Sequence, residues 1–277
     1  MVIVQEKLPV VSYVAIDNKK ISVVKNPNAE RTAFQHTKEF LNSSNAVFRC
    51  FQLADRTLKL VVEALKRVGS PMVGYLEGIA SKFTVAWTST SILRLPDVTS
   101  RAIQSINDLN TDIADTATDF TRKSVKAVHD FFEMATMYFY SGAFFWAPLK
   151  IVGDIPDFIS NATELQLNAQ DLHLTTRAIK VASAQNCSVE VEQALSHTQR
   201  NSFIKTLKAA CSVASGVLGL SVMMLGGPIL PAVALVTLSL AGTILAMTSH
   251  FYQESSPFKM VDFFDRRSIE ILPLAAG

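Results

Sequence analysis

Apolar residues dominate the chain most strongly near its C-terminal end, where residues 209–253 include no Asp, Glu, Lys or Arg. A helix needs about 20 apolar residues to cross a bilayer core, so this stretch is long enough for two spans and too long for one. Gly226, Gly227 and Pro228 interrupt it near the middle, and glycine ends a helix readily while proline suits the first turn of the next. The pattern predicts a transmembrane helical hairpin at 207–251, with its turn at these three residues.

A pair of buried helices in a soluble core is the alternative, but a soluble helix usually keeps one polar face. The polar residues of the stretch are mainly Ser and Thr, whose hydroxyls can bond to carbonyls of their own helix. Small residues also recur four positions apart, a spacing that lets two helix backbones approach closely in lipid. The residues expected to pack in this way are Ser212, Ser215, Gly216, Gly219, Gly242 and Ala246. This packing is expected within the hairpin, and a contact between two copies of the chain is the alternative.

Basic residues flank the predicted hairpin on both sides. Lys208 lies at its start, and Arg266 and Arg267 follow it, whereas the turn between the helices has no charge. Because basic residues near the ends of spans favour the cytosolic side, both ends of the chain are expected in the cytosol. The segment at 252–277 is then a cytosolic tail, and only the turn of the hairpin reaches the far leaflet.

The segment before the hairpin contains two long apolar stripes with helical spacing. Between residues 33 and 68 the apolar positions alternate four and three apart, which is a heptad pattern. From residue 98 to residue 135 the spacing is four, four and three, which predicts one straight helix. We expect these two stripes to pack against each other in a helical bundle. The chain is accordingly divided into a cytosolic helical domain at 27–185, a linker helix at 186–206 and the hairpin.

The second stripe has another interpretation, because an amphipathic helix can also lie on a lipid surface. Such helices usually carry Lys and Arg on the polar face, whereas this one carries Asp108, Asp112, Asp115 and Asp119, so we favour the bundle.

The uncharged run at 134–149 fits either the packed end of a core helix or contact with the membrane interface, where aromatic rings are common. Its candidate interface residues are Tyr138, Tyr140, Phe144, Phe145 and Trp146.

The N-terminal segment differs from the rest because its apolar residues are mostly β-branched. They flank the polar turn residues Asp17 and Asn18, which predicts a short β-hairpin or extended arm within 1–26. The expected fold class is therefore all-α: a long-helix bundle with a small N-terminal β-hairpin and a C-terminal two-helix transmembrane hairpin.

Composition and motifs exclude several classes of function. The chain has 277 residues, of which 49% are hydrophobic and 18% charged, with a formal net charge of +2. This composition excludes intrinsic disorder and argues against a nucleic-acid partner. Cys50, Cys187 and Cys211 lack metal-ligand spacing, and the sequence has neither a phosphate-binding glycine loop nor a nucleophile elbow. We therefore expect no catalytic residue, no metal and no cofactor, and the chain is not expected to be an enzyme.

The hairpin at 207–251, with Gly226, Gly227 and Pro228 as its turn, resembles the bilobed hydrophobic segment of the inclusion membrane proteins of chlamydiae. In that family two closely spaced spans are flanked by segments that face the cytosol. The resemblance implies type III secretion, insertion into the inclusion membrane and a helical part that binds host proteins. The chain departs from the commonest layout of the family because its hairpin lies near the C-terminus.

Two functions are consistent with these patterns. The first is a membrane-anchored protein whose cytosol-facing domain is an interaction or scaffold module, with the lipid bilayer and at least one protein as partners. The alternative is a membrane-shaping or lipid-binding protein that acts through amphipathic helices. Long helices and an aromatic run before a C-terminal anchor are similar to the peroxins of peroxisome proliferation. A homo-oligomer is compatible with both functions.

Overall fold

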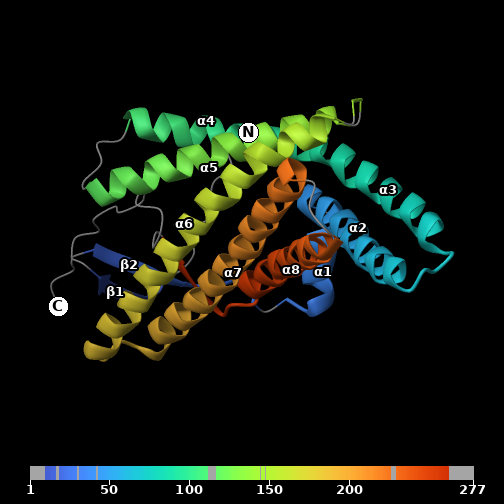
Figure 1. Ribbon diagram of the computed structural model, residues 1–277. Coiled ribbons are helices and arrows are strands. Elements are labelled where there is room, and N and C mark those ends of the chain that lie inside the picture. Colours follow the sequence, from blue (N-terminus) through green and yellow to red (C-terminus); the bar gives the residue numbers. More distant parts are fainter. Residues whose placement is uncertain are drawn as a thin grey trace, which may run out of the picture.

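Long α-helices make up most of the protein, and a small antiparallel sheet lies at one end of them (Figure 1). The computed structural model describes residues 10–16, 19–29, 31–41, 43–111, 117–143, 145–146, 148–225 and 229–261. The helices are α1 (Ala33–Leu41), α2 (Ser44–Arg67), α3 (Val73–Thr90), η1 (Ser91–Arg94), α4 (Leu95–Thr111), α5 (Ala117–Gly142), α6 (Leu149–Ala184), α7 (Val189–Leu225) and α8 (Ile229–Glu254). The strands are β1 (Val10–Ile16), β2 (Lys19–Lys25) and β3 (Phe258–Val261). The expected all-α fold class with a small β-hairpin is confirmed.

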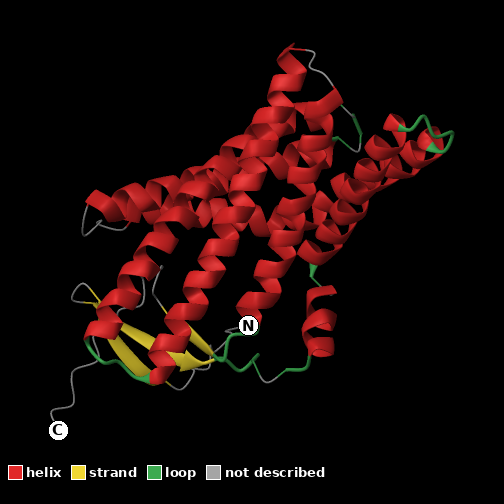
Figure 2. Ribbon diagram, turned by 60° about the horizontal axis from the view of Figure 1, so that its bottom comes forward, coloured by secondary structure: helices red, strands yellow, loops and turns green. Residues whose placement is uncertain are grey.

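The sheet joins the two ends of the described chain. Strands β1 and β2 form the predicted antiparallel hairpin, and β3 adds to its other edge with Val24 opposite Lys259. Figure 2 shows this sheet beside the ends of two long helices. Val23 is buried there against Ala178 of α6 and Leu195 of α7. Residues 258–261, which belong to the predicted cytosolic tail, therefore form an edge strand. This short sequence has no alternation of apolar and polar residues that would indicate a strand.

Asn26 connects the N-terminal strands to the end of α8. Its side chain is fully buried, and Nδ2 donates hydrogen bonds to the carbonyls of Glu254 at 3.0 Å and Ser256 at 2.7 Å. Its backbone N–H donates to the carbonyl of Pro257 at 2.9 Å. One buried amide thus satisfies polar backbone groups just past a helix end, where helix carbonyls lack partners of their own.

The first heptad stripe forms two helices rather than one. Helix α2 begins after Ser43, whose hydroxyl accepts a hydrogen bond from the backbone N–H of Ala46, as an N-cap does. It ends at Arg67, and Gly69 just beyond has a positive φ of 63° that glycine adopts without strain. Helix α2 packs along α3 and α8, and the second stripe approaches it mainly at one end, where Phe48 meets Val98 and Met137. The prediction that the two stripes pack against each other is therefore wrong, because their helices meet only at this end.

The second stripe is also divided, because α4 and α5 form an antiparallel pair. Nη1 of Arg101 lies 2.8 Å from Oε2 of Glu133, and Ser105 donates a hydrogen bond to Asp130. The prediction of one continuous helix at 98–135 is therefore wrong. The residue spacing did not reveal the break because two successive amphipathic helices can continue the same periodicity.

Helix α6 begins at Leu149 and continues through Pro156. Gly153 lies inside its second turn, where a Cβ atom would come within 2.9 Å of Cβ of Phe139 and 3.0 Å of the Tyr140 ring. The glycine therefore allows α5 and α6 to approach closely. Gly153 does not interrupt the helix, because the packing of α5 against α6 outweighs the low helix propensity of glycine.

Helices α6, α7 and α8 form successive antiparallel neighbours, with α4 and α5 beyond α6 and with α2 against α8 (Figure 1). Helix α7 runs without interruption from Val189 to Leu225, so the predicted linker helix at 186–206 and the first helix of the hairpin form one element. The predicted hairpin turn at Gly226, Gly227 and Pro228 lies outside the described residues.

Candidate functional site

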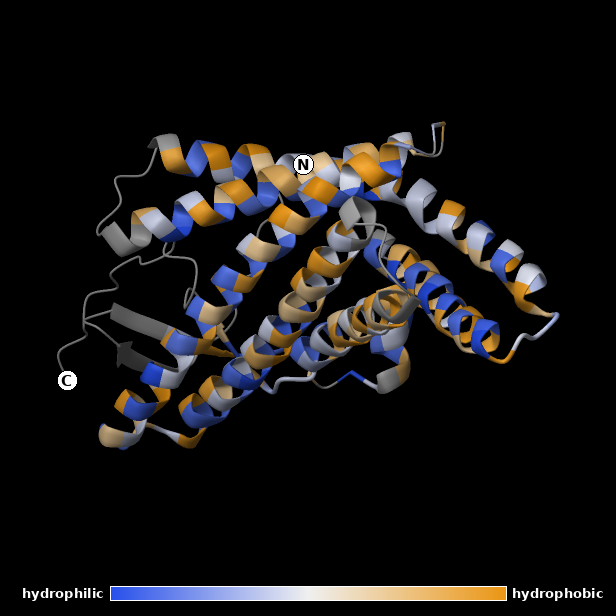
Figure 3. Cartoon of the chain, in the orientation of Figure 1, coloured by the Kyte–Doolittle hydropathy of each residue, from blue (hydrophilic) through white to orange (hydrophobic). Residues whose placement is uncertain are grey.

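Two helices in the described part of the chain are long and apolar enough to cross a membrane. The segments are Val189–Ser221, with a mean hydropathy of 1.3 in its most apolar window, and Ala232–Glu254, with 1.8. Figure 3 shows that polar and apolar residues alternate along α4, α5 and α6. Length and composition therefore distinguish α7 and α8 from the other helices.

The small residues predicted for helix packing lie at two different contacts. Between α7 and α8, the hydroxyls of Ser215 and Ser239 are 2.6 Å apart. A Cβ atom added to Gly242 would meet Oγ of Ser212 at 3.3 Å, which shows how closely the two backbones approach. One added to Gly219 would meet a side chain of α8 at 3.3 Å.

Gly216 belongs to the second contact. A Cβ atom there would come within 2.7 Å of the Phe158 ring of α6, so this glycine accommodates α6 and not α8. Ala246 lies in the last third of α8 and lines a hollow together with Lys205 and Lys208 of α7. The face of α7 that the four-residue spacing identified is thus shared between its two neighbours, α6 and α8.

The candidate interface aromatics separate into exposed and buried side chains. Phe145 and Trp146 follow α5 and are 82% and 61% exposed, and Tyr138 is also exposed. Tyr140 is buried: its ring packs edge-on against Trp87 with centroids 5.1 Å apart, and its hydroxyl donates to Asp154 at 2.9 Å. Tyr140 therefore does not face outward as an interface residue would. Phe144 lies outside the described residues.

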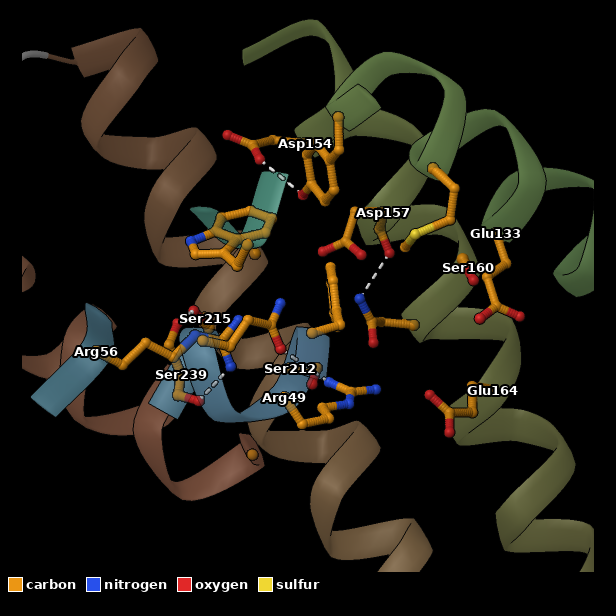
Figure 4. Close-up of a pocket in the computed structure, with 18 of the residues that line it drawn as sticks. Arg49, Arg56, Glu133, Asp154, Asp157, Ser160, Glu164, Ser212, Ser215 and Ser239 are labelled. Atoms are coloured by element: carbon orange, nitrogen blue, oxygen red, sulfur yellow. Dashed lines mark hydrogen bonds between the residues drawn. The ribbon is translucent and has the colours of Figure 1, made fainter. Parts of the chain in front are cut away.

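The structure assembles one large polar pocket that the sequence did not indicate. Its volume is about 560 Å³, and side chains of α2 to α8 line it. Figure 4 shows Arg49, Ser212 and Glu164 directed into the same space. The lining includes seven Lys or Arg and six Asp or Glu side chains, so it has an excess of one positive charge when His129 is neutral. The apolar hairpin helices thus place their small polar residues against a densely charged interior.

An ion-pair network closes the α4–α5 side of the pocket. Nη2 of Arg94 lies 2.9 Å from Oε1 of Glu133, and Nη1 of Arg101 lies 2.8 Å from Oε2 of the same carboxylate. Burial by itself would raise the pKa of Glu133, but the charges of Arg101 and Arg94 outweigh it and hold this pKa at about 2, below its ordinary value of 4.5. Glu133 is therefore a charged structural group at neutral pH.

A second buried carboxylate organises the α2–α3 side. Asp55 accepts hydrogen bonds from Nε1 of Trp87 at 3.1 Å, from the hydroxyl of Thr84 at 2.7 Å and from Nζ of Lys59 at 2.9 Å. Three donors compensate for the loss of water around this charge, as a buried carboxylate requires. At the opposite end of the pocket, Lys208 of α7 pairs with Glu164 of α6.

His129, Asp130 and Glu133 place one ligand atom each within 4.8 Å of one another, which is close enough for a metal ion. Both carboxylates already have partners, however, since Glu133 pairs with two arginines and Asp130 accepts from Ser105. Nδ1 of His129 lies 2.9 Å from the carbonyl of Ser160. A cation would have to displace guanidinium groups from this cluster, so its chemistry does not fit a metal site.

The spacing of charged residues contained a partial signal for the pocket. Arg49 and Arg56 are seven residues apart on α2, and Asp157 and Glu164 are seven apart on α6. Seven residues make two helical turns, so each pair shares a face. A charged pair on a helix is usually solvated, and only the packing of α2 and α6 around the hairpin turns both faces inward.

A comparison of the chain with protein-family models, with curated proteins and with solved structures finds no match.

Proposed function

We propose that the protein is an integral membrane protein anchored by α7 and α8, with both ends of the chain on the cytosolic side and with the other helices acting as an interaction or scaffold module. The observation that carries this proposal is the sheet, in which β2 precedes and β3 follows the hairpin. Val24 of β2 lies opposite Lys259 of β3, so the chain enters and leaves the hairpin at the same end of the molecule. A chain that crosses the bilayer twice returns to the side on which it entered, whereas a chain that crosses once does not.

The length of the hairpin also supports an anchor. Between Lys208 and Leu225 helix α7 has no charged residue, and at 1.5 Å per residue this segment extends about 26 Å. A hydrocarbon core is about 30 Å thick, so the turn would reach the far leaflet. The resemblance to inclusion membrane proteins adds the proposal that this membrane is the inclusion membrane and that the partner is a host protein.

Exposed apolar side chains on α4 and α5 support the interaction role. Ile103 and Ile106 of α4 and Phe131 of α5 lie on the surface of the protein, although Ile106 and Phe131 belong to the stripe expected in a core. Large exposed apolar residues on neighbouring helices are typical of surfaces that bind a partner.

We expect tags at both ends of the full chain to be digested when protease is added to the cytosolic side of intact membranes. The reason is that the paired strands β2 and β3 keep the two ends together. The measurement is the loss of each tag on immunoblots, with a lumenal marker as the control. Protection of the C-terminal tag alone would contradict the two-span anchor.

In the same membranes, Ile103→Ser with Phe131→Ser should reduce cross-linking to cytosolic proteins, whereas Phe34→Ser should not.

Membrane shaping or lipid binding is the second candidate, and the turn between α5 and α6 favours it. Phe145 and Trp146 are exposed there, and Ile151, Val152 and Ile155 on the first turns of α6 are exposed as well. On the same turns Asp154 and Asp157 line the pocket. A helix with charges directed inward and apolar residues outward is typical of one whose outer face meets lipid.

We expect the emission of Trp146 to shift to shorter wavelength when vesicles are added to the protein with Trp87→Phe, because an exposed indole then enters the headgroup region. Brominated lipids should quench it. The matched control is the protein with Trp146→Phe, in which the buried Trp87 should show neither change. An unchanged Trp146 spectrum at saturating lipid would eliminate the α5–α6 turn as a lipid contact, and an unchanged vesicle shape in electron micrographs would eliminate membrane shaping.

A further inference from the structure

Two arginine side chains line the pocket without a carboxylate partner. Nη1 of Arg49 donates to Oε1 of Gln52 at 3.1 Å, and Arg56 donates to the carbonyl of Ser239 at 2.7 Å and to the hydroxyl of Thr243. Among the described residues, neither guanidinium forms an ion pair. Each side chain therefore keeps a full positive charge in a partly desolvated site, where an anion would be attracted strongly.

The remaining cations around the pocket already have acidic partners, so they do not compete for a ligand. These pairs are Lys59 with Asp55, Arg94 and Arg101 with Glu133, Lys150 with Asp154, and Lys208 with Glu164. The positive charge available to a ligand is thus concentrated on one face of α2.

Neighbouring positive charges make the environment of Arg49 unfavourable in the absence of an anion. Burial, together with the charges of Arg94 and Arg56, lowers the pKa of Arg49 from 12.5 to about 10. The guanidinium groups of Arg49 and Arg94 also lie 5.6 Å and 4.9 Å from the centroid of the Phe48 ring. A bound anion would relieve the repulsion between these groups.

The wall opposite the arginines supplies hydroxyl groups and one uncompensated acid. Ser212 and Ser215 of α7 and Ser239 of α8 line the pocket. The hydroxyls of Ser215 and Ser239 are hydrogen-bonded to each other, so Ser212 and one member of that pair can donate to an oxyanion. Asp157 of α6 also lines it and forms no ion pair among the described residues. Its charge offsets one arginine, so the lining keeps an excess of one positive charge and favours an anion with a single negative charge.

We propose that the pocket binds a phosphodiester group between Arg49 and Arg56, with the serine hydroxyls of α7 and α8 as further donors. A phosphodiester has one negative charge, which matches the excess charge of the lining, and its two free oxygens suit the paired N–H donors of a guanidinium. Leu220 of α7 and Leu235 of α8 line another part of the pocket and provide an apolar surface for a substituent of the phosphodiester. The volume of about 560 Å³ is within the usual range for small-molecule sites.

This proposal does not depend on whether the hairpin crosses a bilayer. A phosphodiester occurs in a phospholipid and equally in a water-soluble glycerol phosphodiester, and the two sources share the same chemistry at the arginines. Two probes separate them: dihexanoyl phosphatidylglycerol, which has short acyl chains, and its deacylated headgroup, glycerophosphoglycerol.

The test uses the full chain, purified and delipidated in a detergent without phosphorus, and titration calorimetry with each probe. The wild-type protein should bind the short-chain lipid or both probes, and Arg49→Gln and Arg56→Gln should each raise Kd at least tenfold. Arg67→Gln is the matched control, because Arg67 is an exposed arginine on the same helix, and its Kd should stay within twofold of wild type. Binding of both probes assigns the site to the headgroup alone, and binding of the lipid only assigns it to a phospholipid.

Arg49→Lys provides a variant that preserves the charge if a glutamine variant fails to fold. It removes the forked donor geometry, so we expect Kd to rise at least threefold relative to Arg67→Lys. No binding of either probe by the wild-type protein would overturn the proposal. Equal affinity in the Arg49, Arg56 and Arg67 variants would also overturn it.

Discussion

Replacing Glu133 by glutamine is expected to lower the free energy of unfolding by about 3 kcal/mol. The substitution removes the negative charge shared by Arg94 and Arg101 and leaves two guanidinium groups without a counter-ion, one of them largely buried. Breaking a buried ion pair on one side is strongly destabilising because the remaining charge has lost both water and partner. The measurement is the unfolding midpoint and slope in denaturant for the detergent-solubilised protein.

The same carboxylate makes stability depend on pH in a predictable direction. The pKa of Glu133 is about 2 in the folded protein, below its ordinary value of 4.5, so its stabilisation is complete above pH 4.5. It should be lost progressively as pH falls from about 4.5 to about 2, and Glu133→Gln should flatten this part of the profile. The matched control is Asp97→Asn, which changes an exposed partner of Arg101 and should cost less than about 1 kcal/mol. Equal effects of the two substitutions would contradict the central role of Glu133.

Replacing Trp87 by alanine is expected to destabilise the protein by about 3–5 kcal/mol. The indole is buried and packs edge-on between two rings, with centroids 5.7 Å from Phe48 and 5.1 Å from Tyr140. Its removal leaves a cavity where α2, α3 and α5 meet, and it deprives Asp55 of a hydrogen-bond donor. Thermal unfolding followed by circular dichroism would measure the loss.

Two further substitutions separate packing from hydrogen bonding at this position. Trp87→Phe keeps most of the ring contact but removes one of the three hydrogen bonds to the buried Asp55, so it should cost about 1–3 kcal/mol. Tyr75→Ala removes an exposed aromatic side chain from the same helix and should change stability by about 0.5 kcal/mol or less. A loss for Trp87→Ala no larger than that for Tyr75→Ala would show that this cluster is not part of the core.

Features that depend on residues close together in the sequence were predicted well, and features that depend on contacts between distant segments were missed. The β1–β2 hairpin depends on neighbouring residues, and it was predicted correctly. The break between α4 and α5 was missed because the apolar spacing continues across both helices. Strand β3 was missed because its four residues have no local signal and become a strand only by pairing with β2.

The candidate site shows the same limit. The four-residue spacing of small residues identified the face of α7 that approaches other helices, but not which helix each residue meets, and Gly216 faces Phe158 of α6. The aromatic run 134–149 was open to two interpretations, and its side chains differ: Tyr140 is packed inside while Phe145 is exposed. A side chain's direction depends on how its helix is rotated in the bundle, which spacing alone does not determine.

By itself, the sequence determined the helical class, the small β-hairpin and the two membrane-length apolar helices, because these depend on propensity, periodicity and the length of charge-free sequence. Only the tertiary structure decided that the charged faces of α2 and α6 turn inward against the hairpin and enclose a polar pocket. Arg49 and Glu164 are far apart along the chain, and either would be solvated on an isolated helix. They share one pocket because burying the remaining surfaces of the helices around it leaves their polar sides facing one another.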